Sequence, residues 1–258
     1  MNLTNDFLIQ AQGVIERVFR SYREELIAKS GNIETTYKAD NTVVTALDRK
    51  IEKDLRAALI EFDGSIGIEG EELGIEGNRT TYWLLDPIDG TDSFVRGIPL
   101  YRNVATLIDD GRAVFALVYK PATNELFVAA DGEGVYRNGQ PIHIGQRPLS
   151  RSTLDIMGRL DNPDIQSIIR AIQPKLDGVR RTSDFLSVVQ GQLDGQISLG
   201  RSAGSWDFVP RALLIKEAGG RVANIGSDSY DFRINNYLAT NPVIFDELME
   251  LIVTALKK

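Results

Sequence analysis

The chain has 258 residues, 43% hydrophobic and 25% charged, which is enough to bury a core as one unit or two small domains and excludes a mainly disordered protein. Acidic residues outnumber basic ones by 36 to 29, a net charge of −7 that argues against nucleic-acid or anionic-membrane partners. The sequence contains no cysteine and a single histidine, His143. This composition excludes thiolate catalysis, iron–sulfur and zinc–thiolate sites, disulfides and chemistry that needs two imidazoles.

The amino terminus lacks the positively charged and apolar segments of a secretory signal. The longest apolar run, Ala113 to Tyr119, is far shorter than the roughly 20 residues that cross a membrane. We therefore expect a cytoplasmic protein with no membrane partner.

The first half of the chain predicts two amphipathic helices followed by strands. Apolar residues recur at helical spacing from Leu3 to Leu26, with Gly31 as the stop, and again over residues 47–61. Short apolar runs then alternate with Asp-Gly and Asn-Gly turns. This pattern predicts an antiparallel meander with strands at residues 82–86, 104–108, 113–120 and 125–129.

After about residue 148 the pattern changes to a succession of strands and helices, which predicts an α/β layer. The segments are 153–158, 164–172, 179–182, 185–190, 195–199, 206–217, 221–224, 237–240 and 242 to the end. We expect an amino-terminal α+β half, residues 1–148, and a carboxy-terminal α/β half, residues 149–258. No repeat or flexible linker is visible between them, so a cleft between the halves is the expected place for a site.

The most informative stretch runs from Trp83 to Phe94. An apolar strand delivers Asp86 to its end, and Pro87 stops it. Asp89 and Gly90 follow, and a short helix can begin at Thr91 with its free N–H groups available to an anion. Carboxylates beside a phosphate need a divalent cation between them, and Mg²⁺ suits carboxylate ligands. The alternative is that Asp-Pro-x-Asp-Gly is only a turn.

Two further acidic segments have ordinary explanations when each is taken alone. Glu69 to Glu72 follows a short apolar strand, residues 65–68, and the alternative is a solvated acidic loop. Ser205-Trp206-Asp207 stands where a helix begins, so Ser205 or Asp207 can be an N-terminal cap.

Together these segments resemble the inositol monophosphatase family of lithium-sensitive, Mg²⁺-dependent phosphatases. The motifs are Gly70-Glu71-Glu72, then Trp83 to Thr91 with Asp86-Pro87-Ile88-Asp89-Gly90-Thr91, and Trp206-Asp207 followed by Ala218-Gly219-Gly220. The resemblance covers nearly the whole chain. It implies a mixed α/β (α+β) fold, a layered αβαβα sandwich of the inositol monophosphatase and fructose-1,6-bisphosphatase type, and a homodimer.

The resemblance also implies two to three Mg²⁺ ions per site. Glu71, Asp86 and the carbonyl of Ile88 would hold the first ion, and Asp86, Asp89 and Asp207 the second. A third, weaker ion would rest mainly on Glu71. Asp86 would thus be shared by two cations, an arrangement suited to in-line displacement at phosphorus.

The catalytic pair implied by the resemblance is Thr91 with Asp48, which together with Glu71 and the metal would activate a water, so that no phosphoenzyme forms. The backbone N–H groups of Gly90 and Thr91 would bind the phosphate, with Asp89 and Asp207 also near the substrate. From the residues alone, Asp48 can instead be an acid favoured by a helix N-terminus, and Thr91 a cap.

The implied substrate is a small phosphorylated metabolite, and its identity stays open among three candidates: an inositol phosphate, histidinol phosphate or a sugar bisphosphate. Residues 197–201 contain no acid, although inositol-type enzymes commonly have one there. Ser93 to Pro99 looks more like the histidinol-phosphate branch. Arg181 stands where that branch often has an acid, which favours a second anionic group on the substrate unless Arg181 is a solvated strand end. The alternative in another class is a noncatalytic relative that binds metal or a metabolite and regulates a partner.

The remaining polar and aromatic residues near the motifs have simpler interpretations. Lys38 lies near the position of a family lysine at the cleft mouth but is one residue out of the expected spacing. We expect His143 to be a surface or structural residue. The other expectations are that Arg96 and Arg102 are surface charges and that Trp83, Phe94 and Trp206 are packing residues.

Overall fold

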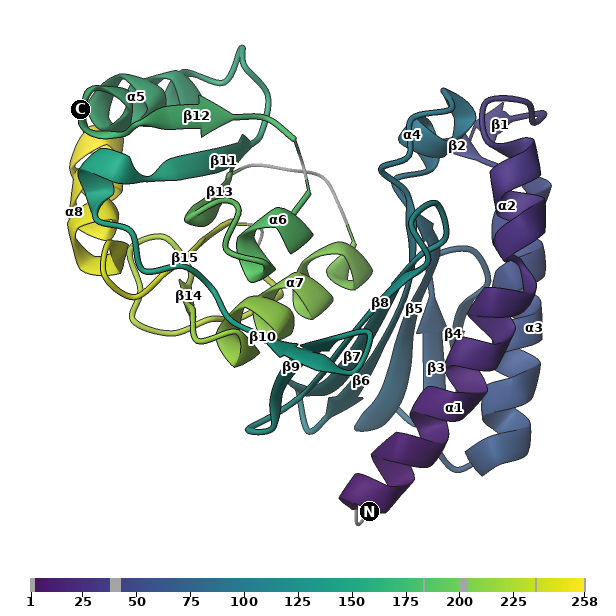
Figure 1. Ribbon diagram of the computed structural model, residues 1–258. Helices are drawn as coiled ribbons and strands as arrows, with labels where there is room; N and C mark the ends of the chain where they lie inside the picture. The colour runs from purple at the N-terminus through teal and green to yellow at the C-terminus, as the bar shows by residue number, and fades with distance from the viewer. Residues whose placement is uncertain (1–2, 38–42, 183, 200–203, 235, 258) are drawn as a thin grey trace. The chain divides into compact units, whose positions relative to one another are not determined.

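The computed structural model describes residues 3–37, 43–182, 184–199, 204–234 and 236–257. Its contacts divide the chain into two units, residues 1–131 with 136–140, and residues 132–135 with 141–258. Residues 141–148 thus group with the second unit, whereas the sequence analysis placed them in the first. Figure 1 shows the elements of each unit along the chain.

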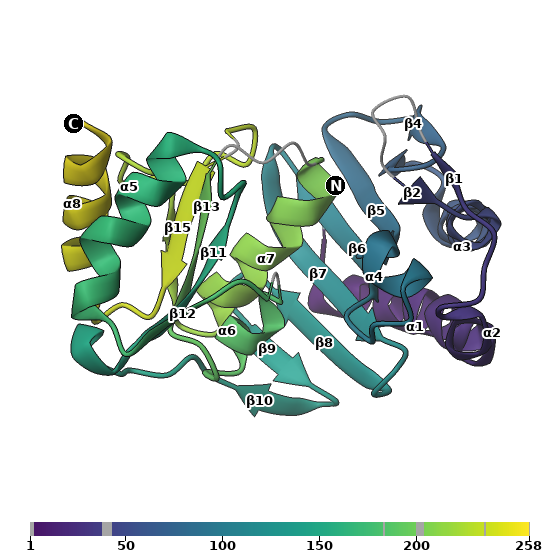
Figure 2. The same cartoon turned by 90° about the horizontal axis from the view of Figure 1, so that it is seen from above.

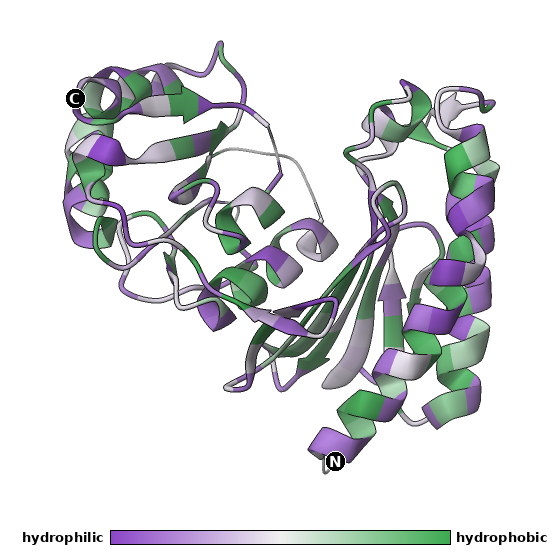
Figure 3. Ribbon diagram, in the orientation of Figure 1, coloured by the Kyte–Doolittle hydropathy of each residue, from purple (hydrophilic) through white to green (hydrophobic). Residues whose placement is uncertain are grey.

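Two long helices cover one face of a sheet in the first unit (Figure 1). Helix α1 (Asn5–Ser21) begins at Thr4, whose side chain accepts from the N–H of Phe7, and buries Ile15 and Phe19. Helix α3 (Ala46–Asp63) begins at a capping box formed by Thr45 and Asp48 and buries an apolar stripe. Polar and apolar residues alternate around α1 in Figure 3, as expected for a helix with one buried face.

The single helix expected from Leu3 to Leu26 is instead two helices. The chain leaves regular helical geometry at Tyr22, and α2 (Arg23–Lys29) follows. Tyr22 is buried, and its hydroxyl donates a hydrogen bond to Asp54 of α3. The break thus coincides with a tertiary contact, which helical periodicity in the sequence does not reveal.

Most of an eight-stranded sheet belongs to the first unit, and its strand order is β10-β9-β8-β7-β6-β5-β3-β4. The strands are β3 (Gly67–Gly70), β4 (Gly74–Glu76), β5 (Thr81–Asp89), β6 (Arg102–Asp109), β7 (Arg112–Lys120), β8 (Glu125–Ala130), β9 (Gly134–Arg137) and β10 (Gln140–Ile142). Strands β5 to β8 form the predicted antiparallel meander, whereas β3 pairs in parallel with β5. A separate hairpin joins β1 (Thr36–Tyr37) and β2 (Val43–Val44).

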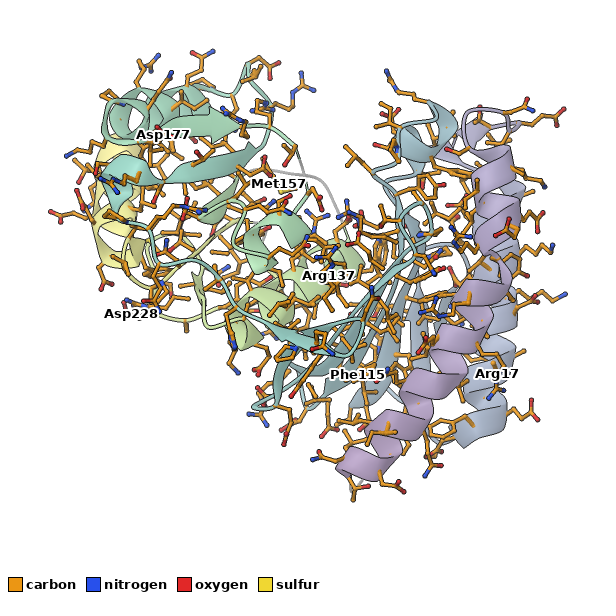
Figure 4. All side chains as sticks on the ribbon, in the orientation of Figure 1. Arg17, Phe115, Arg137, Met157, Asp177 and Asp228 are labelled. Carbon is orange, nitrogen blue, oxygen red and sulfur yellow. The ribbon has the colours of Figure 1, made fainter. Side chains whose placement is uncertain are left out.

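Aromatic side chains pack against one another beside the central strands of this sheet. Trp83 on β5 is buried and contacts Phe115 on β7 edge to face, with the ring centroids 6.1 Å apart. Phe115 is labelled in Figure 4. Phe94, on the short helix α4 (Thr91–Val95), is also fully buried and packs on Tyr101. The expectation that Trp83 and Phe94 are packing residues is confirmed.

The second unit has a five-stranded sheet in the order β12-β11-β13-β15-β14. Its strands are β11 (Thr153–Met157), β12 (Gly178–Arg180), β13 (Gly195–Leu199), β14 (Arg221–Ala223) and β15 (Asn236–Thr240). Strand β11 is parallel to β12 and β13, and β15 is antiparallel to β13 and β14. The short 3-10 helices η1 (Leu149–Arg151) and η2 (Gln173–Lys175) flank this layer.

Helices lie on both faces of this second sheet (Figure 2). Helices α5 (Pro163–Ile172) and α8 (Phe245–Leu256) pack together on one face, and α6 (Leu186–Val189) and α7 (Ser205–Glu217) lie on the other. The first unit thus provides a helical layer and a sheet, and the second provides helix, sheet and helix. The predicted mixed α/β layers are confirmed. Within the described ranges, no helix combines the length and apolarity needed to cross a membrane.

Candidate active site

A bulge at the end of β5 brings two carboxylates together. In a regular strand, residues three apart face opposite sides of the sheet, so Asp86 and Asp89 would diverge. The pairing with β6 shifts between them: Asp86 opposes Val104, but Asp89 opposes Arg102. Carboxylate oxygens of Asp86 and Asp89 lie within 4.8 Å of each other. Both side chains are buried, with exposed fractions of 2% and 7%.

Pro87 and its neighbours explain why the bulge forms here. Proline has no N–H to give to the ladder, so the strand loses a regular hydrogen bond at that position. The carbonyl of Pro87 instead accepts a hydrogen bond of 2.5 Å from Nδ2 of Asn103, a fully buried residue of β6. The sequence motif and this side chain on the neighbouring strand together determine the local bend.

Glu71 reaches the same edge of the sheet from the parallel strand β3. Gly70 opposes Leu85, and the N–H of Glu71 donates to the carbonyl of Leu85 at 3.1 Å. Because the carboxyl ends of parallel neighbours meet at one edge, Glu71 follows β3 where Asp86 follows Leu85 on β5. Glu71 is half-buried rather than fully solvated, so the interpretation as a solvated loop does not describe it.

Asp48 and Thr91 form a contact that joins α3 to the start of α4. The Thr91 hydroxyl lies 3.3 Å from Oδ1 of Asp48 and 2.8 Å from the carbonyl oxygen of Ile88. Oδ2 of Asp48 accepts from the N–H and the hydroxyl of Thr45, which completes the capping box. Asp48 is therefore both a helix-terminal acid and a partner of Thr91, and it uses a different oxygen for each.

The environment of Asp48 makes its carboxylate more basic than that of an exposed aspartate. Burial raises the pKa of the Asp48 carboxyl above its usual value, and the negative charge of Glu71 raises it further, while the Thr45 hydrogen bonds oppose the shift. A carboxylate whose pKa is raised accepts a proton from a neighbouring hydroxyl more readily than an ordinary aspartate does.

Gly90 makes the turn between β5 and α4 possible. Its backbone is left-handed, with φ 88°, and a Cβ atom there would lie 2.8 Å from the carbonyl oxygen of Leu100. Any other residue would be strained as well as crowded. Gly90 is the N-cap of α4 and Thr91 its first residue, so the interpretation of Thr91 as the cap is wrong.

The loop that carries Glu71 is held by Glu52, which the sequence analysis missed. Glu52 is fully buried on α3 and accepts hydrogen bonds from the N–H groups of Glu72 and Leu73, at 2.8 and 3.1 Å. Its other partner is Arg56, at 2.9 Å. A Cβ atom at Gly70 would come within 2.0 Å of Glu52, so the motif glycine is needed here. The signal in the sequence is an acid inside the apolar stripe of α3 with an arginine four residues later.

Glu52→Gln is expected to destabilise the chain by about 3 kcal/mol, because it leaves buried Arg56 without its nearest counter-charge. The matched control is Glu76→Gln, because Glu76 lies 3.7 Å from the same arginine but is itself exposed, so solvent screens the contact and we expect its loss to cost less than about 1 kcal/mol. Urea unfolding in chelator measures both variants. Equal losses of stability would contradict the role assigned to Glu52.

Arg102 is not the surface charge that the sequence analysis expected. It begins β6 opposite Asp89, and its exposed fraction is 4%. Its Nε atom lies 3.0 Å from Oδ2 of Asp89. Arg102 opposes Asp89 because the bulge shifts the register between β5 and β6, and the sequence pattern does not predict that bulge. Arg96, by contrast, is exposed and pairs with Asp92, as expected.

Asp207, the remaining acid of the predicted ligand set, lies on the first turn of α7 in the second unit. The N-cap of α7 is Gly204, with no side-chain cap, so the interpretation of Ser205 or Asp207 as the cap is wrong. Oδ1 of Asp207 lies 3.6 Å from Nη2 of Arg211, one turn along the helix, and Arg211 is buried. Trp206, expected to be a packing residue, is only partly buried.

The structure describes Arg181 but not Lys38. Arg181 follows β12 and is exposed, and its Nη2 donates to the carbonyl of Gly158 at 2.5 Å. A role for Arg181 in substrate binding therefore stays a prediction. Lys38 lies outside the described residues, as do Gly200 and Arg201 in the segment without an acid.

The donor set of the first unit fits a hard divalent cation. Asp86 and Asp89 offer carboxylate oxygens within 4.8 Å of each other, and Ile88 offers a backbone carbonyl at the same strand end. Glu71 follows the neighbouring strand, but among the described residues its carboxylate is not in that close group, so its role as a ligand stays a prediction. Mg²⁺ prefers oxygen ligands, whereas zinc sites draw on thiolate and imidazole, and the sequence has no cysteine. The residues present therefore fit Mg²⁺.

Comparisons with known proteins identify the family of the chain. The family model described as "Inositol monophosphatase family" matches residues 3–258. An inositol-1-monophosphatase of Mesorhizobium japonicum is 31% identical over 234 residues, 86% of each chain, and a histidinol-phosphatase of Mycobacterium tuberculosis is 29% identical over 265 residues, 96% of this chain and 98% of the other. The crystal structure of extragenic suppressor protein suhB from Bartonella henselae matches with a TM-score of 0.85 and 26% identity, over 94% of this chain and 98% of the other. With motifs, fold and a match over nearly its whole length in agreement, the chain belongs to the inositol monophosphatase family.

Proposed function

We propose that the chain is a Mg²⁺-dependent phosphomonoesterase that hydrolyses a small phosphorylated metabolite by direct attack of water. The observation that carries the proposal is the approach of Asp86 and Asp89 within 4.8 Å at a strand end that also carries the Thr91–Asp48 contact. Metal ligands and a proton acceptor are then available at one edge of one sheet. No protein nucleophile is required.

We assign the metal ligands from the close approach of the carboxylates and from the family to which the chain belongs. Glu71, Asp86 and the Ile88 carbonyl would hold one Mg²⁺, and Asp86, Asp89 and Asp207 a second. Bound Mg²⁺ would supply Lewis-acid stabilisation of the phosphoryl and leaving oxygens and a lowered pKa for the attacking water. Asp207 is included because it stands in the Trp206-Asp207 motif, and its contribution is part of the proposal.

Thr91 and Asp48 would move the proton. The Thr91 hydroxyl has one proton and two acceptors, the Ile88 carbonyl and Oδ1 of Asp48, so it donates to one at a time. When it donates to Asp48, its oxygen can accept a proton from the attacking water. The carboxyl of Asp48, whose pKa is raised by burial, then becomes the proton's destination.

The turn at Gly90 would hold the phosphate. The first N–H groups of a helix have no acceptor within the helix, and those of Gly90 and Thr91 lie at the start of α4. Oriented N–H groups stabilise the negative charge of a phosphoryl group as it develops. Asp89 and Asp207 would contact the substrate through the metal that they share.

The substrate class is one with a second anionic group. Exposed Arg181 can receive such a group, and residues 197–201 carry no acid for inositol hydroxyls. A sugar bisphosphate fits both features. Histidinol phosphate is the second candidate, because a relative named histidinol-phosphatase matches 96% of this chain. An amine on the substrate would, however, meet a cationic side chain at Arg181.

The test is phosphate release from inositol 1-phosphate, histidinol phosphate, fructose 1,6-bisphosphate and adenosine 3′,5′-bisphosphate, with Mg²⁺ and with chelator. We expect release in Mg²⁺ only, fastest with a bisphosphate. A bisphosphate rate that is unchanged by Arg181→Ala would refute the role of Arg181 but not the phosphatase. Lithium should inhibit the reaction, as the family resemblance implies. Absence of release from every ester in saturating Mg²⁺ would favour a noncatalytic relative that binds metal or a metabolite.

A further inference from the structure

Arg102 is a buried cation in direct contact with a proposed metal ligand. The side chains of Arg102 and Asp89 have exposed fractions of only 5% and 8%, and the Nε to Oδ2 distance is 3.0 Å. Nη2 of Arg102 also lies 3.4 Å from the carbonyl of Leu100. An arginine side chain carries a positive charge, so a cation lies beside the Asp89 carboxylate.

Burying this guanidinium is costly, and packing alone does not require it. Removing an ion from water carries a large penalty that its partner only partly offsets, and an apolar side chain of similar size is often equally stabilising. A second proposed ligand has the same kind of neighbour, since buried Arg211 lies 3.6 Å from Asp207. Two carboxylates assigned to one cation therefore each have a fixed arginine beside them.

We propose that Arg102 is a built-in cation of the active site that weakens the binding of divalent metal at Asp89. This inference rests on the proposed function, because it takes Asp89 to be a metal ligand. A guanidinium and a divalent ion on one carboxylate repel each other, and burial reduces the screening of that repulsion by water. The chain would need a higher Mg²⁺ concentration to fill the Asp89 site than it would with a neutral residue at position 102.

A simpler role for Arg102 predicts the opposite change in metal affinity when the arginine is replaced by a neutral residue. If Arg102 only orients Asp89, any neutral replacement should misplace the carboxylate and weaken metal binding. If Arg102 competes with the metal, a neutral replacement should strengthen binding. The direction of the change therefore separates an orienting residue from a competing cation.

The experiment is calorimetric titration of Mg²⁺ into the full chain and into three variants, Arg102→Gln, Arg102→Met and Arg102→Lys. We expect Gln and Met to tighten binding by about tenfold or more, because removing one nearby charge is worth at least about one factor of ten at such distances. Lys should stay within about threefold of the unchanged chain. The control is Arg96→Gln, which removes an exposed arginine paired with Asp92 and should leave the affinity unchanged.

Each outcome decides the proposal. Weaker or unchanged Mg²⁺ affinity in the Gln and Met variants would overturn it, while Mg²⁺ binding and phosphate release by the unchanged chain would leave the proposed function standing. No Mg²⁺ binding and no phosphate release by the unchanged chain would defeat the proposed function itself. If a neutral variant is unfolded in chelator, recovery of its far-ultraviolet circular dichroism on adding Mg²⁺ supports the proposal, and failure to recover contradicts it.

Discussion

Replacing Asp86 by asparagine is expected to lower Mg²⁺-dependent phosphate release by about 10³-fold or more. Asp86 is the one carboxylate that the proposal assigns to both cations, and stabilisation by such ions is worth several kcal/mol. The amide keeps the size of the side chain but loses its charge. The second expected effect is on stability: Mg²⁺ raises the melting temperature of the unchanged chain by binding the folded state, and the variant should lose that rise.

The control for this variant is Asp92→Asn. Asp92 lies six residues further along, on α4, but it is exposed and pairs with exposed Arg96. Its replacement should change phosphate release by less than about threefold, since exposed pairs contribute little. Full activity in Asp86→Asn, or an equal loss in Asp92→Asn, would show that Asp86 is not a ligand of an essential metal.

Thr91→Ala is expected to lower kcat by about 10²-fold, because a positioned proton acceptor contributes at least that factor. Thr91→Ser keeps the hydroxyl and should recover most of the loss. The KM should change much less than kcat, since the proposed role of the hydroxyl is in the chemical step and not in binding. Steady-state kinetics at saturating Mg²⁺ measure kcat and KM for the unchanged chain and for both variants.

The partner of Thr91 in this role can be identified by a double-mutant comparison with Asp48→Asn. If Thr91 acts through Asp48, the two replacements together should cost little more than the larger of the two alone. Losses that multiply would mean that the 3.3 Å contact does not carry the proton. Asparagine can still accept a hydrogen bond from Thr45, so the capping box at the start of α3 is largely kept.

Much of the first unit could be predicted from its sequence because local rules and tertiary structure agree there. The meander from β5 to β8 follows from alternating apolar runs and Asp-Gly turns. Pro87 does not stop β5 as the sequence analysis expected: the strand bulges there and runs on to Asp89, and it ends at Gly90, whose left-handed backbone is a local property. The α/β character of the second unit was visible in the same way.

The features that the sequence did not predict depend on contacts between segments that are distant in sequence. The break at Tyr22 is coupled to Asp54, thirty-two residues away. Glu52 supports the loop at Glu72 from another element, so its role is visible only as an acid on an apolar stripe. Arg102 meets Asp89 because the bulge shifts the register between β5 and β6. A one-residue shift reverses which face a side chain occupies, and no composition or spacing rule predicts it.

The most direct test of the account is to locate the metal in crystals grown with Mn²⁺, which accepts the same oxygen ligands and can be identified by its anomalous scattering. We expect an anomalous peak in direct contact with the carboxylates of Asp86 and Asp89, and its loss in Asp86→Asn crystals. Catalytically active protein whose peaks all lie elsewhere, with these two carboxylates turned away from each other, would contradict the account.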